Sequence, residues 1–163
     1  MYLNALLFAC ATGCAQEPPG DDLPGPPQPF DARRFDDMVA GTMKSYLQLQ
    51  DALAHDEFAA AQVAAAALAD PSDADLTEAA KIAADADDIA ALRIAFRPLS
   101  ELLIARNVPT GMAVAYCPMA FDFEGGRWLQ LEGDISNPYY GASMLRCGAF
   151  EQNADTSETP DER

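Results

Sequence analysis

Residues 89–117 read IAALRIAFRPLSELLIARNVPTGMAVAYC, and the period of the apolar side chains changes within this stretch. Its first half repeats an apolar residue every third or fourth position, which predicts one face of a helix. The residues of this face are Ile89, Leu92, Phe96, Leu99 and Leu103. After Thr110, Met112, Val114 and Tyr116 alternate with alanines, which is typical of a strand. The stretch therefore predicts a mainly helical fold that ends in a small β unit.

Three further helical segments are expected before this stretch, each with apolar residues on one face. They cover approximately residues 35–53, 56–68 and 72–83. Asp31 is the expected N-cap of the first segment, and Pro98 is expected to kink or split the last helix. Four helices with short connections predict an antiparallel helical bundle. Residues 127–131 are expected to return along the first strand as a small C-terminal β-hairpin that lies on this bundle.

The two ends of the chain differ in composition from the middle. Residues 1–14 hold a short apolar stretch, and residues 15–30 are rich in proline and glycine, as expected of an extended linker. Residues 151–163 are polar and acidic, which predicts a disordered tail. These boundaries leave one folded domain, residues 31–150.

The first residues predict an export signal of the lipoprotein type. The apolar run is too short to cross a bilayer, and Ala11, Thr12 and Gly13 place small residues directly before Cys14. Cys10 is a poorer candidate for lipidation because Phe8 occupies a position where a small residue is expected. The segment departs from the usual signal pattern in one respect, since the basic residues expected near Met1 are missing. We therefore expect lipidation at Cys14 and a periplasmic, lipid-anchored protein, with the outer membrane as the expected location.

The formal net charge of the chain is −16, and the acidic residues are spread along its length. Nucleic-acid binding needs clustered Lys and Arg, so we expect no nucleic-acid partner. Attraction to an anionic lipid surface is excluded on the same ground. Contact with a membrane is therefore expected only through the N-terminal lipid anchor.

Two short motifs near the C-terminus each pair a thiol with a thioether. Cys117-Pro118-Met119 comes first, and Met144-Leu145-Arg146-Cys147 follows about 25 residues later. Thiolates and thioethers are soft ligands that select Cu(I), and by the same softness Ag(I). Cys117, Met119, Met144 and Cys147 are therefore candidate metal ligands. Zinc is a poorer match because structural zinc sites use four Cys or His ligands.

A disulfide between Cys117 and Cys147 is the competing interpretation. An exported domain with two cysteines usually pairs them, and such a bridge would contribute roughly 3–4 kcal/mol on the chain-entropy model. Met119 and Met144 would then be packing residues beside aromatic rings. The two interpretations can also be redox states of one site, with the reduced dithiol binding the metal.

Several motifs in a fixed order resemble a bacterial family of unassigned function. They are Tyr116-Cys117-Pro118-Met119-Ala120, Trp128-Leu129-Gln130, Ile135-Ser136-Asn137-Pro138-Tyr139-Tyr140-Gly141 and Met144-Leu145-Arg146-Cys147-Gly148. Members of that family occur as small exported proteins and as C-terminal extensions of periplasmic adaptor subunits of copper/silver efflux pumps of the resistance–nodulation–division type. The resemblance covers roughly residues 35–149. It implies a role near copper or silver handling, with metal-efflux components of the envelope as partners.

Catalysis is not expected. The chain has one histidine, His55, which lies in the helical half and far in sequence from both cysteines. No nucleophile, base and acid therefore form a plausible set. We expect either a metal-binding accessory protein or a non-catalytic interaction module of the cell envelope with a structural Cys117–Cys147 disulfide.

Overall fold

The computed structural model describes residues 28–70 and 72–151. Their fold is mainly α-helical with a small antiparallel sheet, as the sequence predicted. The predicted signal segment with Cys14, and most of the predicted linker and tail, lie outside the described residues.

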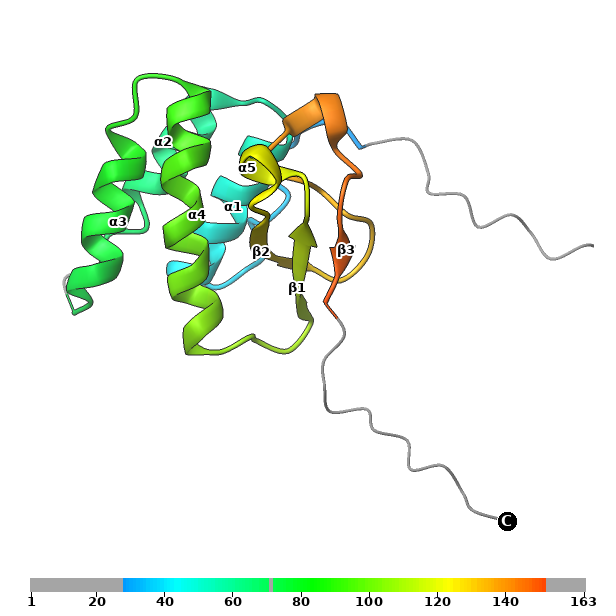
Figure 1. Cartoon of the computed structure of the whole chain (residues 1–163). Helices are drawn as coiled ribbons and strands as arrows, with labels where there is room; N and C mark the ends of the chain where they lie inside the picture. The colour runs from blue at the N-terminus through cyan, green and yellow to red at the C-terminus, as the bar shows by residue number, and fades with distance from the viewer. Residues whose placement is uncertain (1–27, 71, 152–163) are drawn as a thin grey trace, which may run out of the picture.

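Four helices come first, and the sheet follows them in the chain. The helices are α1 (Thr42–Ala54), α2 (Phe58–Ala66), α3 (Ala74–Ala84) and α4 (Ile89–Arg106). The second part contains β1 (Met112–Cys117), the short turn α5 (Ala120–Phe123), β2 (Gly126–Leu131), the 3-10 helix η1 (Gly141–Met144) and β3 (Ala149–Phe150). Consecutive helices pack on one another, and α4 and α1 also contact β2, so the helices lie on one side of the sheet (Figure 1).

Helix boundaries follow local capping chemistry. Asp73 accepts a hydrogen bond from the Leu76 amide at 3.0 Å, and Asp88 accepts one from the Ala91 amide at 2.8 Å. Each bond satisfies a backbone donor that the first turn of a helix leaves unpaired. Pro98 lies inside α4, which runs through it without being split.

The predicted start of the first helix is wrong. The helix begins at Thr42 and not near Phe35, and Gly41, not Asp31, is its N-cap. Gly41 has a φ of 153°, a conformation that favours glycine and ends any helical run before it. Residues 31–37 form turns instead, and Phe35 still packs into the core with 5% of its surface exposed.

The sheet has three strands in the order β2-β1-β3. The predicted hairpin is confirmed: β1 and β2 pair antiparallel, with Met112 opposite Leu131 and Cys117 opposite Gly126. The sequence did not predict β3, which pairs antiparallel with the other edge of β1 and sets Ala149 opposite Tyr116.

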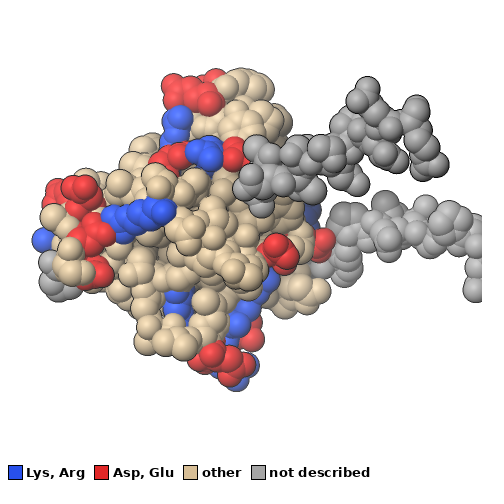
Figure 2. All heavy atoms as spheres, turned by 90° about the horizontal axis from the view of Figure 1, so that it is seen from below, with Lys and Arg blue, Asp and Glu red and all other residues tan. Residues whose placement is uncertain are grey.

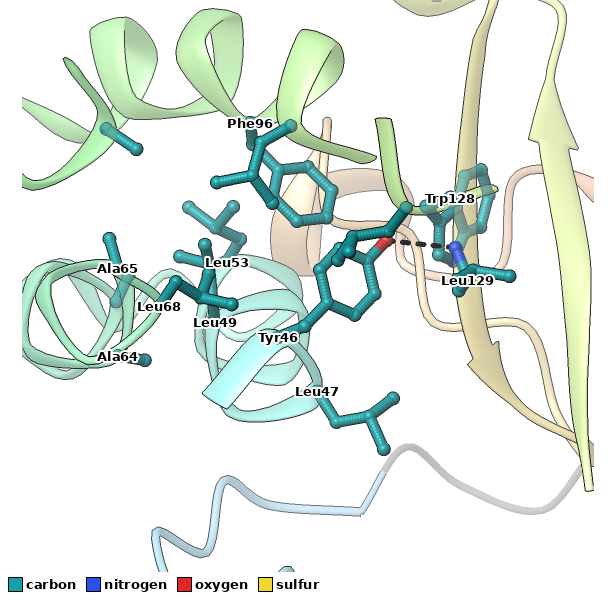
Figure 3. Close-up of a cluster of buried hydrophobic side chains, with 14 of the residues drawn as sticks. Tyr46, Leu47, Leu49, Leu53, Ala64, Ala65, Leu68, Phe96, Trp128 and Leu129 are labelled. Atoms are coloured by element: carbon teal, nitrogen blue, oxygen red, sulfur yellow. Dashed lines mark hydrogen bonds between the residues drawn. The ribbon is translucent and has the colours of Figure 1, made fainter. Parts of the chain in front are cut away.

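The core joins the helices to the sheet through aromatic side chains (Figure 3). Tyr46 of α1 and Phe96 of α4 stack with ring centroids 5.4 Å apart, and both are fully buried together with Trp128 of β2. The Tyr46 hydroxyl also accepts a hydrogen bond from the Leu129 amide at 2.9 Å. Trp128 thus lies between the sheet and the helices, whereas Tyr116 of β1 is 37% exposed.

Charged side chains of both signs lie side by side on the face seen in Figure 2. They gather in small mixed groups around the rim, and the centre of this face carries few charges. No continuous basic stripe crosses this view.

Candidate functional site

The two cysteines come together because β3 pairs with β1. Cys117 is the last residue of β1, and Cys147 lies two residues before β3 begins. Antiparallel pairing sets Tyr116 opposite Ala149, which brings the preceding turn beside Cys117. The two Sγ atoms lie 3.3 Å apart, and both thiols are free. Cys117 is fully buried, whereas Cys147 is partly exposed.

Met119 adds a third sulfur to this pair. Its Sδ lies 3.9 Å from Cys147 Sγ, and the residue is 37% exposed. Tyr140 fixes the backbone at this point because its hydroxyl donates a hydrogen bond to the Met119 carbonyl at 2.5 Å. We call Cys117, Cys147 and Met119 the sulfur cluster.

Met144, the fourth predicted ligand, is placed differently. It ends η1, and its backbone carbonyl accepts a hydrogen bond from the Cys147 amide at 3.0 Å. Among the described residues, the hydrogen bonds between sulfur atoms join Cys117, Cys147 and Met119 and do not include Met144. The structure thus brings three of the four predicted ligands together.

A buried asparagine shapes the loop that carries Cys147. Asn137 is fully buried, and its side-chain amide donates to the Cys147 carbonyl at 2.7 Å. Its side-chain oxygen accepts from the Tyr139 amide at 2.8 Å, and its own amide donates to the Leu145 carbonyl at 2.8 Å. These bonds hold both ends of residues 137–147 in one arrangement.

An arginine of α4 ties this loop to the helices. Arg93 donates to the Pro138 carbonyl at 2.9 Å and to Asp56 at 2.5 Å. The other oxygen of Asp56 accepts a hydrogen bond from the Ala142 amide at 3.0 Å. The position of Cys147 therefore depends on helical residues more than 50 positions before it.

A left-handed turn follows Met119. Phe121, Asp122 and Phe123 have φ values of 53°, 55° and 71°, so α5 is not a right-handed helix. L-residues pay about 1–2 kcal/mol each in this conformation. Arg97 of α4 lies over the Phe121 ring at 4.8 Å and pairs with Glu124 at 2.8 Å, which holds the turn in place.

Electrostatics around the sulfur cluster disfavour negative charge. Burial raises the pKa of Cys147, and the hydrogen bond and charge of Cys117 raise it further. The pKa of Tyr140 is also raised, first by desolvation and then by the two thiols. A cation bound to the two sulfurs would counteract the raised pKa of Cys147, because positive charge stabilises the thiolate form.

The residues that support the cluster were not found from the sequence. Asn137 and Pro138 are residue types typical of turns, but nothing local indicated that Asn137 would be buried against Cys147. Arg93 lies on α4, 45 positions before Pro138, and no local pattern in the sequence indicated that it would bind the loop of residues 137–147. Asx-turn chemistry at Asn137 was the one available signal.

The described residues hold neither a cluster of His, Cys, Asp and Glu ligands nor a helix that spans a membrane. There, no group of three or more His, Cys, Asp and Glu side chains could hold a metal ion. Nor is any helix of residues 28–70 and 72–151 long and apolar enough to cross a membrane.

Comparisons with known proteins add no relative to these observations. No family model, no curated protein and no solved structure matches this chain. The resemblance to the copper-associated family stays a prediction from the quoted motifs.

Proposed function

We propose that this protein binds Cu(I) or Ag(I) through Cys117, Cys147 and Met119 and serves heavy-metal handling at the cell envelope. One observation carries the proposal: three soft sulfur atoms from two distant segments converge, with separations of 3.3 and 3.9 Å. Soft thiolate and thioether ligands select monovalent copper over harder ions.

The distances suit a three-coordinate site. A metal–thiolate bond of about 2.3 Å places three sulfurs of a trigonal plane about 4.0 Å apart. The Met119–Cys147 separation of 3.9 Å already meets this value, and the Cys117–Cys147 separation of 3.3 Å must widen slightly. The ion would reach Cys117 past Met119, because Met119 is exposed and Cys117 is buried.

The cellular role follows from the quoted motifs and the charge of the chain. A net charge of −16 favours cations over nucleic acid. We propose a lipid anchor at Cys14, a periplasmic location at the outer membrane and a non-catalytic role as metal buffer or donor to efflux components. The predicted antiparallel arrangement of four helices also belongs to this proposal, and the pairwise packing of α1 to α4 supports it.

Anaerobic titration of the reduced protein with Cu(I), against a competing chelator, tests the proposal. We expect one ion per chain, loss of binding in Cys117→Ser and weaker binding in Met119→Leu. Met144→Leu and Met38→Leu are matched controls, since neither sulfur belongs to the sulfur cluster, and both should bind as the unmodified protein does. Absence of Cu(I) binding by the reduced protein would contradict the proposal.

The alternative is an envelope interaction module with a structural Cys117–Cys147 disulfide. The proximity of the two thiols favours this alternative. Their sulfur atoms are 3.3 Å apart, so a movement of only about 1.3 Å brings them to the disulfide bond length of about 2.05 Å. Intact-mass analysis of protein isolated from an oxidising compartment distinguishes the two. A bridge that persists in mild reductant, together with no affinity for Cu(I), would support the interaction module.

A further inference from the structure

A second candidate site is a cavity beside α1, and two of its lining residues, Leu145 and Arg146, directly precede Cys147 in the chain. This cavity of about 210 Å³ opens between the turns at residues 28–35, helix α1 and the loop after β2. Its polar lining includes Arg34, Asp51, His55, Gln130, Asp134 and Arg146. We call it the Asp51 cavity.

Asp51 brings a buried carboxylate with one unpartnered oxygen to this cavity. It is 2% exposed, and its Oδ1 accepts a hydrogen bond from Arg34 at 2.7 Å. His55 Nδ1 is 3.7 Å from the same oxygen. No donor among the described residues reaches Oδ2. Desolvation raises the pKa of Asp51 although Arg34 and His55 act to lower it, so a further positive group at Oδ2 would stabilise the carboxylate form.

Arg146 brings an unpaired hydrogen-bond donor to the same cavity. One terminal nitrogen donates to the Ile135 carbonyl at 2.8 Å, and the other pairs with Asp134 at 3.1 Å. Its Nε is buried, and no acceptor within the described part of the chain reaches it. Asp51 Oδ2 and Arg146 Nε are the two buried side-chain polar atoms of residues 28–70 and 72–151 that lack a partner, and both residues line this cavity.

Gln50, Gln130 and His55, which also line the cavity, already face hydrogen-bond partners. Gln50 donates to the Ser136 carbonyl at 2.6 Å, and Gln130 donates to the Asp134 carbonyl at 2.9 Å. The Gln130 side-chain oxygen accepts from Trp128 and from the Ser136 amide, each at 3.0 Å. Both ring nitrogens of His55 face backbone carbonyls, at 2.7 and 3.0 Å. The missing hydrogen-bond partners are therefore one donor for Asp51 Oδ2 and one acceptor for Arg146 Nε.

We propose that the Asp51 cavity binds a small zwitterion of the free amino-acid type, with its ammonium group on Asp51 and its carboxylate on Arg146. Buried polar groups without partners are costly, so a ligand that pairs both gains more than either half alone. Each protein charge keeps its present ion pair, to Arg34 and to Asp134, which favours a ligand without net charge. The cavity volume exceeds the roughly 30 Å³ share of one water several-fold.

Binding requires a small rearrangement, because both unpartnered atoms are covered in this structure. The side chains of Arg34 and Arg146 are 48% and 31% exposed, so small movements that keep their ion pairs to Asp51 and Asp134 can uncover the two atoms. Ligand entry past these arginines is consistent with their place at the cavity wall.

Titration of the full chain, followed by NMR, tests this site. L-alanine and L-glutamine are the zwitterionic probes, while methylammonium and acetate each carry one half of the charge pattern. We expect saturable shifts of the Arg146 Nε–H signal, and dissociation constants for the zwitterions at least tenfold below those of either half. Asp51→Asn and Arg146→Gln should each weaken zwitterion binding at least tenfold. Arg33→Gln, which removes a side chain 84% exposed and outside the cavity, should leave binding unchanged.

The titration of the unmodified chain does not depend on whether the variants fold. No saturable shift at millimolar zwitterion would overturn the proposal, as would equal affinity for methylammonium, acetate and the amino acids. A crystal structure grown with L-glutamine that shows only water bridging Asp51 and Arg146 would also overturn it. Unchanged affinity in a folded Asp51→Asn variant would do the same.

Discussion

The hydroxyl of Tyr46 is a polar group buried in the centre of the core. It accepts from the Leu129 amide at 2.9 Å and bonds Ser100 Oγ at 2.7 Å, so it joins α1, α4 and β2. Burial raises the pKa of this phenol, which keeps it protonated and able to donate to Ser100. The hydroxyl thus satisfies a buried amide that the edge position of β2 leaves without a strand partner.

Tyr46→Phe should lower the free energy of unfolding by about 1–3 kcal/mol, because it leaves a buried amide and a buried hydroxyl unpaired. Urea denaturation measures the change. Tyr116→Phe is the matched control, since Tyr116 is partly exposed, and it should stay within about 0.5 kcal/mol. Equal effects of the two substitutions would show that the buried hydroxyl contributes nothing specific.

In the proposed Cu(I) site, the thiol of Cys147 would make metal binding depend on pH. Its pKa is raised, so the thiol is protonated at neutral pH and must release its proton to bind Cu(I). Apparent Cu(I) affinity should therefore increase with pH, about tenfold per unit for each proton released. Competition titrations at several pH values measure the slope.

Two variants check the origin of that slope. Met119→Leu should keep it, because a thioether releases no proton, whereas Cys147→Ser should reduce it. A slope that Cys147→Ser leaves unchanged would assign the proton to another group.

At the scale of the elements, the chain turns at Gly133, after β2, and at Gly148, between Cys147 and β3. Gly148 and Gly133 have nearly the same φ, 134° and 133°, which side chains rarely adopt. Their surroundings differ: a Cβ at Gly148 would lie 2.9 Å from Trp128 and 2.9 Å from the Tyr116 carbonyl, whereas Gly133 faces open space. Alanine substitutions at these two glycines therefore distinguish the cost of backbone strain, which both share, from the cost of steric overlap, which only Gly148 has.

Gly133→Ala should cost about 1–3 kcal/mol of stability from backbone strain alone. Gly148→Ala should cost the same strain plus about 1–3 kcal/mol of overpacking, because the Tyr116 backbone cannot yield as a flexible side chain can. Urea denaturation of both variants gives the difference, and Cu(I) titration of Gly148→Ala shows whether the sulfur cluster is displaced. Equal costs for the two variants would contradict the close approach at Gly148.

The whole molecule is held together by contacts between the sheet and the helices. Trp128 and Leu129 are fully buried, and the loop of Cys147 is tied to α4 through Arg93. A small sheet that buries its face on another layer has no core of its own when that layer is removed. The sulfur cluster is therefore a property of the complete domain and not of residues 107–151.

A fragment of residues 107–151 should be unfolded, with poorly dispersed amide signals in its NMR spectrum and weak, poorly defined Cu(I) binding. Residues 28–151 should fold and show dispersed signals. A dispersed spectrum of the short fragment would show that the sheet is stable without α1 and α4.

Local patterns predicted most elements because they depend on neighbours in the chain. The three-to-four spacing from Ile89 to Leu103 predicted α4, and alternation from Met112 predicted β1. The start of the first helix was missed because one backbone angle at Gly41 outweighed the apolar spacing before it. Asp51, buried with one oxygen unpartnered, looks in sequence like any helix-surface carboxylate.

The sequence by itself determined most of the elements and the soft side chains of Cys117, Met119, Met144 and Cys147. Only the tertiary structure decided which of these sulfurs meet. Cys117 and Cys147 are 30 positions apart, and they become neighbours because β3 pairs with the free edge of β1. That pairing depends on Trp128, Asn137 and Arg93 packing against residues distant in sequence, and such long-range packing leaves no periodic signal in the chain.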